Sequence, residues 1–163
     1  NTERIQNVKE YFVFCCYTGL PFKEMSFLKK KDIYTGFDGK LWIHVDRRKT
    51  GKEYAVPLLP TAKNIIDKFD GENCEFVFPK ISNQKFNEYL KEIAGVVGIQ
   101  KNLTHHVARK TFASTVLLYN DVPMEIVSEL LGHAKMSTTQ ESYGKVVQKK
   151  IGEAMAKLST KIK

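Results

Sequence analysis

A histidine and an arginine three positions apart, His106 and Arg109, form the pattern that most suggests phosphate chemistry. If Thr104 caps a helix at this point, residues with this spacing share one helical face. The arginine fork can bind two phosphate oxygens, and a histidine beside it can exchange a proton near neutral pH. Taken alone, the pattern fits the exposed basic start of an ordinary helix better.

Two further signals lie closer to the carboxyl end of the chain. His133 follows Gly132 directly, and a histidine in that place is often no more than a partner of a helix end. Tyr143 lies beside Gly144 in a polar stretch, as surface tyrosines commonly do. A tyrosine is a weak nucleophile at neutral pH because its pKa is about 10, so it needs a base or strong electrostatic help. Neither signal indicates chemistry when taken alone.

The elements that would position these residues are mostly helices. Hydrophobic spacing, caps and prolines predict helices over 3–18, from Pro21 to Leu28, and over 60–69, 82–97, 104–119, 121–132 and 145–158. Strands at 41–45 and 54–58 form a predicted hairpin around a turn at 49–52, with a short third strand at Ile33 and Tyr34. The predicted fold class is mainly α with a small antiparallel β-sheet (α+β).

Composition limits the class of protein. The chain of 163 residues suits one domain, and its first residues suggest a piece excised from a longer protein. Lysine and arginine total 26 against 18 acidic residues, a net charge of +8 that favours a polyanionic partner such as nucleic acid, although a basic surface alone gives the same count. Three cysteines form no metal-binding pattern and are expected to be reduced. No signal peptide or membrane-length apolar run is visible, so a cytoplasmic location is expected.

The ordered set of motifs resembles the tyrosine recombinase (phage-type integrase) family. Each motif is weak alone, but the set follows the family's order from about residue 11 to 147, and among subgroups it is most similar to integrases of bacterial conjugative transposons. It consists of Tyr17-Thr18-Gly19-Leu20, Glu24, Arg48-Lys49-Thr50-Gly51-Lys52, Val56-Pro57-Leu58, His106 with Arg109, Leu131-Gly132-His133 and Tyr143.

The resemblance implies a DNA strand transferase. Tyr143 would attack a DNA phosphate, form a 3′-phosphotyrosyl link and release a 5′-hydroxyl, with no metal or cofactor. Carried over by position, Arg109 would clamp the phosphate with His106 beside it, His133 would hydrogen-bond the phosphate, and Lys49 would donate a proton to the leaving oxygen. Glu24 would support the site from behind. The residues expected to contact DNA are Arg48, Lys52, Lys110 and Lys135.

The resemblance also implies a larger assembly. Residues 1–163 would be the single catalytic domain of a longer integrase whose amino-terminal DNA-binding domains lie outside this chain. Family members act on double-stranded DNA as tetramers and pass a C-terminal segment to a neighbouring subunit. The helix at 145–158 could be that segment, or it could pack on its own domain.

Two departures from the family pattern bear on activity. Pro21 stands where most members have a phosphate-clamping arginine, so either the domain has lost catalysis or another cation substitutes. Arg47 is the leading substitute because it lies two residues before Lys49, with Lys23 and Arg48 behind it. The gap from His133 to Tyr143 is one residue longer than usual, which predicts a bulged loop around the tyrosine. The alternatives to an integrase are a non-enzymatic DNA-binding module, a type IB topoisomerase, and an RNA-binding or scaffold domain.

Overall fold

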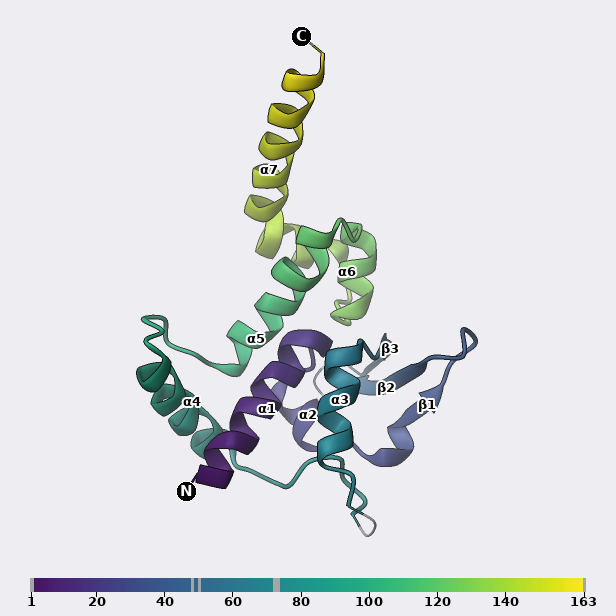
Figure 1. The fold of residues 1–163 in the computed structure, drawn as a ribbon. Helices are drawn as coiled ribbons and strands as arrows, with labels where there is room; N and C mark the ends of the chain where they lie inside the picture. The colour runs from purple at the N-terminus through teal and green to yellow at the C-terminus, as the bar shows by residue number, and fades with distance from the viewer. Residues whose placement is uncertain (1, 48, 50, 72–73, 163) are drawn as a thin grey trace.

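The computed structural model describes residues 2–47, 49, 51–71 and 74–162 of the chain. Figure 1 shows a helical body with a small sheet on one side, and a last helix, α7, that extends away from it. The helices are α1 (Thr2–Thr18), α2 (Phe22–Ser26), α3 (Pro60–Lys68), α4 (Asn83–Val97), α5 (His105–Thr111), α6 (Met124–Leu130) and α7 (Met136–Lys161), and the strands are β1 (Ile33–Thr35), β2 (Leu41–Arg47) and β3 (Lys52–Pro57). The predicted fold class is confirmed.

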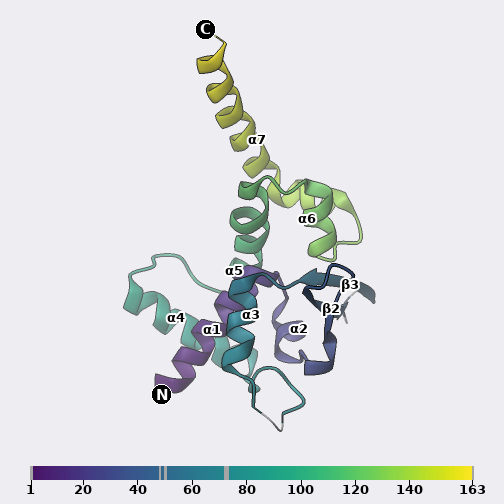
Figure 2. The same ribbon diagram turned by 45° about the vertical axis from the view of Figure 1, so that its right-hand side comes forward.

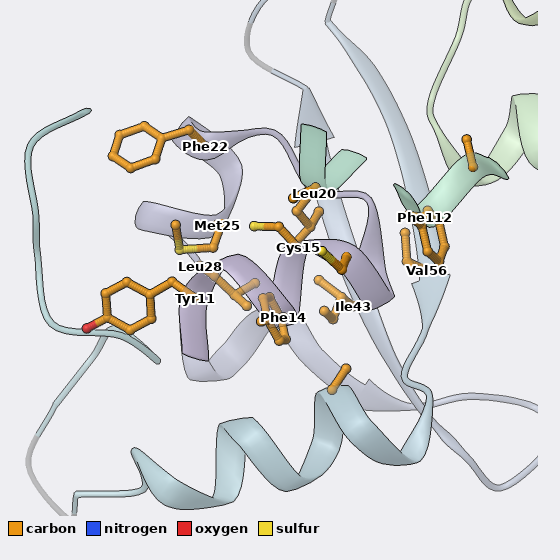
Figure 3. Close-up of a cluster of buried hydrophobic side chains, with 14 of the residues drawn as sticks. Tyr11, Phe14, Cys15, Leu20, Phe22, Met25, Leu28, Ile43, Val56 and Phe112 are labelled. Atoms are coloured by element: carbon orange, nitrogen blue, oxygen red, sulfur yellow. The ribbon is translucent and has the colours of Figure 1, made fainter. Parts of the chain in front are cut away.

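Helix α1 is the centre of the core. Its buried face carries Val8, Tyr11, Phe14 and Cys15, and it packs against α3, α4 and α5. Figure 3 shows this cluster, in which aromatic and branched side chains from α1, α2, the sheet and the segment after α5 meet. The Phe14 ring lies edge-on to that of Phe78, with centroids 4.9 Å apart. Edge-to-face ring pairs of this kind add to the stability that burial alone provides.

The sheet is antiparallel, with strand order β1-β2-β3. Ile43 pairs with Val56, and Val45 pairs with Tyr54. All four side chains are buried, and the residues between them are more exposed, as strand alternation requires. Arg47, the last residue of β2, pairs with Lys52, the first residue of β3, so both lie at the same end of the hairpin.

Two glycines hold the backbone where a side chain would not fit. Gly19 ends α1 with φ +68°, and a Cβ there would lie 2.3 Å from Phe112. Gly132 follows α6 with φ +61°, and a Cβ there would lie 2.5 Å from the ring of Tyr54. Both positions combine a left-handed backbone with close packing, so glycine is needed for two reasons. Each glycine also presents its carbonyl to the region described in the next subsection.

The predicted helix at 104–119 is not one regular α-helix. Helix α5 ends at Thr111 and continues as a π-helical segment, η2 (Phe112–Leu117), and a 3₁₀ turn, η3 (Leu118–Asn120). Thr104 precedes α5, as predicted, but its side chain makes no capping hydrogen bond. π-Helical turns cannot be recognised from hydrophobic spacing, and they occur frequently at functional sites.

The prediction for the last helix was wrong at its start. Helix α7 begins at Met136 rather than at 145 and continues unbroken to Lys161, so Tyr143 lies within a helix and not on a bulged loop. Thr139 and Tyr143 are buried against the body, and being four residues apart they share one helical face. Figure 2 shows that the second half of α7 leaves the body altogether.

The cysteines lie as expected for unpaired thiols: Cys15 and Cys16 are buried, and Cys74 is exposed. Within the described ranges, no helix combines the length and the apolar character that a membrane span requires.

Candidate active site

A pocket of about 690 Å³ brings together several of the residues singled out in the sequence, although neither His133 nor Tyr143 lines it. Arg47 and Lys49 reach it from the hairpin, while His106 and Arg109 reach it from α5. Glu24, on α2, lines the same pocket. Residues as far apart in the chain as Pro21 and Arg109 therefore line one cavity, and its wall is strongly basic.

Pro21, which stands where most family members have an arginine, also lines this pocket, together with the candidate substitute Arg47. Arg47 and Lys49 both line the pocket. The prediction assumed that both lie on one strand, where residues two apart share a face, but Lys49 lies in the turn that follows β2. Position 21 thus lacks an arginine, but Arg47 supplies one to the same cavity.

Arg109 is held in place by two backbone carbonyls. Its guanidinium donates to the Gly19 oxygen and to the Leu131 oxygen, each at 2.6 Å. These bonds tie α5 both to the end of α1 and to the turn after α6. Burial lowers the pKa of Arg109, but the pKa of an arginine lies so far above neutral pH that the side chain keeps its charge.

Three successive carbonyls after α6 each accept a hydrogen bond from a different cation. Leu131 accepts from Arg109, Gly132 from Arg47 at 2.9 Å, and His133 from Lys52 at 2.9 Å. The carbonyl end of a helix carries partial negative charge and attracts cations. The turn that contains the Leu-Gly-His motif is therefore the scaffold that gathers cations from α5, β2 and β3.

The ring of His133 is fixed from α7. Its Nδ1 lies 2.6 Å from the hydroxyl Oγ1 of Thr139. Burial, and then the positive charges of Arg109, Arg47 and Lys52, lower the pKa of His133 to about 4. The imidazole is therefore neutral at pH 7 in the free protein, close to the same cations.

Tyr143 is close to Arg109 but does not line the pocket. Its side chain is only 7% exposed. Burial raises the pKa of the Tyr143 phenol, and the positive charge of Arg109 acts in the opposite direction. In the free protein Tyr143 is thus a neutral, shielded phenol on the part of α7 that packs against the body.

Two residues of the site were missed in the sequence. His105 also lines the pocket, and its ring stacks on that of His106 with centroids 4.0 Å apart. The second residue is Tyr54, which packs on Gly132 and lies beside Arg109. Burial raises the pKa of its phenol. Adjacency to His106 could have indicated His105. Only the strand register, which faces Tyr54 inward, could have indicated Tyr54.

Lys52, Lys110 and Lys135, which were expected to contact DNA, do not line this pocket. Lys110 and Lys135 are exposed, and Lys52 is half-buried and engaged with His133 and Glu129. Arg48 lies outside the described residues. In the part of the chain that the structure describes, no group of three or more histidine, cysteine or acidic side chains is arranged to hold a metal ion.

Comparison with known proteins places this chain in a family. Residues 4–150 match the phage integrase family. The chain belongs to that family. This phage integrase domain is 36% identical over 140 residues to the tyrosine recombinase XerD of Listeria monocytogenes serotype 4b (strain F2365), an alignment that covers 76% of this chain and 45% of XerD. The chain thus spans about half the length of the curated relatives it matches.

Solved structures show the same fold for this integrase domain. The XerA recombinase crystal structure superposes with a TM-score of 0.70 at 20% identity, over 91% of this chain and 63% of that one. The Tn1549 transposon integrase in complex with transposon right end DNA gives a TM-score of 0.67 at 15% identity, over 91% of this chain and 59% of that one. The domain therefore has the fold of tyrosine recombinases, including one from a transposon.

Proposed function

We propose that this chain is the catalytic domain of a site-specific DNA recombinase that breaks and rejoins strands through a phosphotyrosyl link on Tyr143. The observation that carries the proposal is the pocket shared by Arg47, Lys49, His106 and Arg109. A transition state for phosphoryl transfer gathers negative charge on its oxygens, and cations fixed in advance stabilise it without reorganising.

The proposed roles are those that the resemblance to the family implies, and Lys49, His106 and Arg109 share one pocket. The Tyr143 phenol releases its proton to water and its oxygen attacks the phosphorus. The bond from phosphorus to the 5′ oxygen breaks, and Lys49 donates the proton that turns this oxygen into a hydroxyl. Arg109 and His106 bind the non-bridging oxygens, and His133 donates a further hydrogen bond to them. Rejoining is the reverse: the 5′-hydroxyl returns its proton, attacks the phosphotyrosine and releases the phenol. The bond energy is conserved in the link, so the reaction needs no cofactor.

Arg47 is the proposed replacement for the arginine missing at position 21. It lines the pocket together with Pro21, and its hydrogen bond to the Gly132 carbonyl directs the guanidinium beside Arg109. Among the described residues neither arginine forms an ion pair, so both keep their charge for a phosphate. Glu24 lines the same cavity and would support the site from behind, without an ion pair to either arginine among the described residues.

The burial of Tyr143 implies a step before chemistry. A phenol that is 7% exposed and outside the pocket lining must move to reach a phosphate bound there. In this proposal DNA binding accompanies a shift of α7 that brings Tyr143 to the pocket, where the phosphate and the cations help to remove its proton.

Residues 1–163 are proposed to be one catalytic domain of a longer, cytoplasmic integrase, which fits the half-length match to its relatives. Its partners would be double-stranded DNA and further copies of itself. The free end of α7 could reach a neighbouring subunit, because it exposes the apolar side chains of Ile151, Met155, Leu158 and Ile162. Transposon integrases are the subgroup that its sequence pattern favours.

Trapping of the covalent link tests the function. The protein is mixed with a pool of duplexes of randomised sequence, each nicked so that the short 5′-hydroxyl fragment diffuses away after cleavage. A denaturant-resistant adduct should form, peptide mapping should place the DNA on Tyr143, and Tyr143→Phe should abolish the adduct. Tyr119→Phe is the matched control, because Tyr119 is an exposed tyrosine away from the pocket. Absence of any adduct, or an adduct on another residue, would overturn the proposal.

The role of Arg47 is tested in the same assay. Arg47→Ala should lower the rate of adduct formation by roughly 10²–10³, the loss expected when one oxyanion donor is removed from an intact site. Arg4→Ala, at an exposed arginine of α1, is the matched control and should leave the rate unchanged. An unchanged rate in Arg47→Ala, with activity lost in Arg109→Ala, would exclude Arg47 as the substitute.

A further inference from the structure

The Thr139 hydroxyl is a buried polar group outside the roles assigned so far. Its side chain is completely buried on α7, and it contacts the Nδ1 atom of His133 at 2.6 Å. That is the one hydrogen bond of this hydroxyl within the described residues. The contact joins the turn that gathers the cations to the helix that carries Tyr143, one helical turn before the tyrosine.

A hydroxyl in this position must direct its hydrogen somewhere. Buried polar hydrogens nearly always find an acceptor, and the neutral imidazole offers one only on the nitrogen that lacks a proton. The contact with Nδ1 is the hydrogen bond that the described residues give the Thr139 hydroxyl, so a hydroxyl that donates here gives its hydrogen to Nδ1. The proton of neutral His133 then lies on Nε2, at the other side of the ring.

We propose that Thr139 is a positioning residue that holds His133 in its Nε2–H tautomer, so that the imidazole presents an N–H donor to a bound phosphate. This inference deepens the proposed function and rests on it for the identity of the phosphate. A hydroxyl is well suited to the task, because it can turn and accept from Nδ1 when His133 gains a second proton. A carboxylate in this place would favour the protonated ring instead.

The placement of Thr139 also couples two parts of the site. Thr139 and Tyr143 lie on the same face of α7, so a shift of α7 that frees the phenol moves the partner of His133 with it. The orientation of the imidazole and the position of the nucleophile thus depend on one helix.

Nuclear magnetic resonance of the free protein tests the tautomer without any DNA. With ¹⁵N-labelled histidine, and His133 assigned through His133→Gln, the wild type should show Nε2 protonated and Nδ1 bare. Thr139→Val, which keeps the shape and removes the hydroxyl, should give a mixture of both tautomers. Thr139→Ser should restore the wild-type signature. If Thr139→Val leaves the spectrum unchanged, or if the wild type carries its proton on Nδ1, the inference is overturned.

Adduct formation on the nicked duplex pool gives the second readout. Thr139→Val should lower the rate about ten- to a hundredfold, the range expected when a buried imidazole loses its hydrogen bond, and Thr139→Ser should recover most of it. Equal losses in both variants, with intact melting transitions, would mean that Thr139 only fills space. If the valine variant does not fold, Thr139→Ala takes its place beside Thr139→Ser. A wild type that forms no adduct refutes the proposed function, while the spectra still decide the role of Thr139.

Discussion

Replacing Gly132 with alanine should destabilise the domain by two separable effects. A left-handed backbone, here at φ +61°, costs an alanine about 1–2 kcal/mol. The new Cβ would also lie 2.5 Å from the buried Tyr54 ring, and such overpacking costs about 1–3 kcal/mol more. The sum of roughly 2–5 kcal/mol corresponds to a decrease in Tm of roughly 4–20 °C for a domain of this size. Urea unfolding and calorimetry measure both quantities.

Gly98 provides the control that separates the two effects. It has φ +73°, but a Cβ there would meet no atom within 4 Å, so Gly98→Ala should show the backbone cost alone. In a double-mutant cycle, Gly132→Ala and Tyr54→Ala should be less than additive, because removal of the ring removes the clash. Equal losses in Gly132→Ala and Gly98→Ala, with no coupling to Tyr54, would refute the packing argument.

Three further predictions concern titration, capping and thiol access. Because the pKa of His133 is lowered to about 4 from 6.5, the contribution of the neutral ring to stability is complete above pH 6.5 and is lost as the pH falls toward 4. The difference in urea midpoint between wild type and His133→Gln should therefore shrink as the pH falls through this range. A constant difference would contradict the prediction. Ser82→Ala should lower the free energy of unfolding by about 1 kcal/mol because it removes the cap of α4, and Ser82→Thr should keep most of that stability. Equal unfolding curves for wild type and the alanine variant would disprove the cap. Ellman's reagent should label Cys74 quickly in the native protein, while Cys15 and Cys16 react only after unfolding, because burial raises the pKa of both thiols; fast reaction of a second thiol would disagree.

Features with local signals were predicted well from the sequence. Ser82 caps α4 through a backbone N–H, as its position before the apolar stripe indicates. The hairpin was predicted with strands slightly too short, since β2 extends to Arg47 and β3 begins at Lys52. Caps and hairpins depend on neighbouring residues, so the sequence contains most of the information that determines them.

The start of α7 was missed because tertiary packing overrides local preference. The gap from His133 to Tyr143, one residue longer than is usual in the family, suggested a bulged loop, and the threonines in this polar stretch are weak helix formers. In the fold, Thr139 and Tyr143 bury one face of the helix against the body, and that burial stabilises the turns before residue 145.

The contacts that hold the cations could not be predicted by any local pattern. Arg109 bonds to the carbonyl of Gly19, which lies 90 residues away in the chain. Its other acceptor is the backbone carbonyl of Leu131. Because every residue has a backbone carbonyl, the residue types in the sequence do not reveal which ones accept from Arg109. The sequence singled out Arg47, Lys49, His106 and Arg109, which line one pocket, and only the fold indicates what holds the two arginines there.

The backbone carbonyls after α6 have a consequence for how the domain meets its polyanion. A carboxylate that held Arg47 or Arg109 would cancel its charge before any phosphate arrived, whereas a carbonyl fixes the direction of the guanidinium and carries no net charge. The free domain therefore holds uncompensated like charges at close range, which repel one another. An arriving phosphate relieves that repulsion as well as attracting each cation, so docking should make the domain itself harder to unfold.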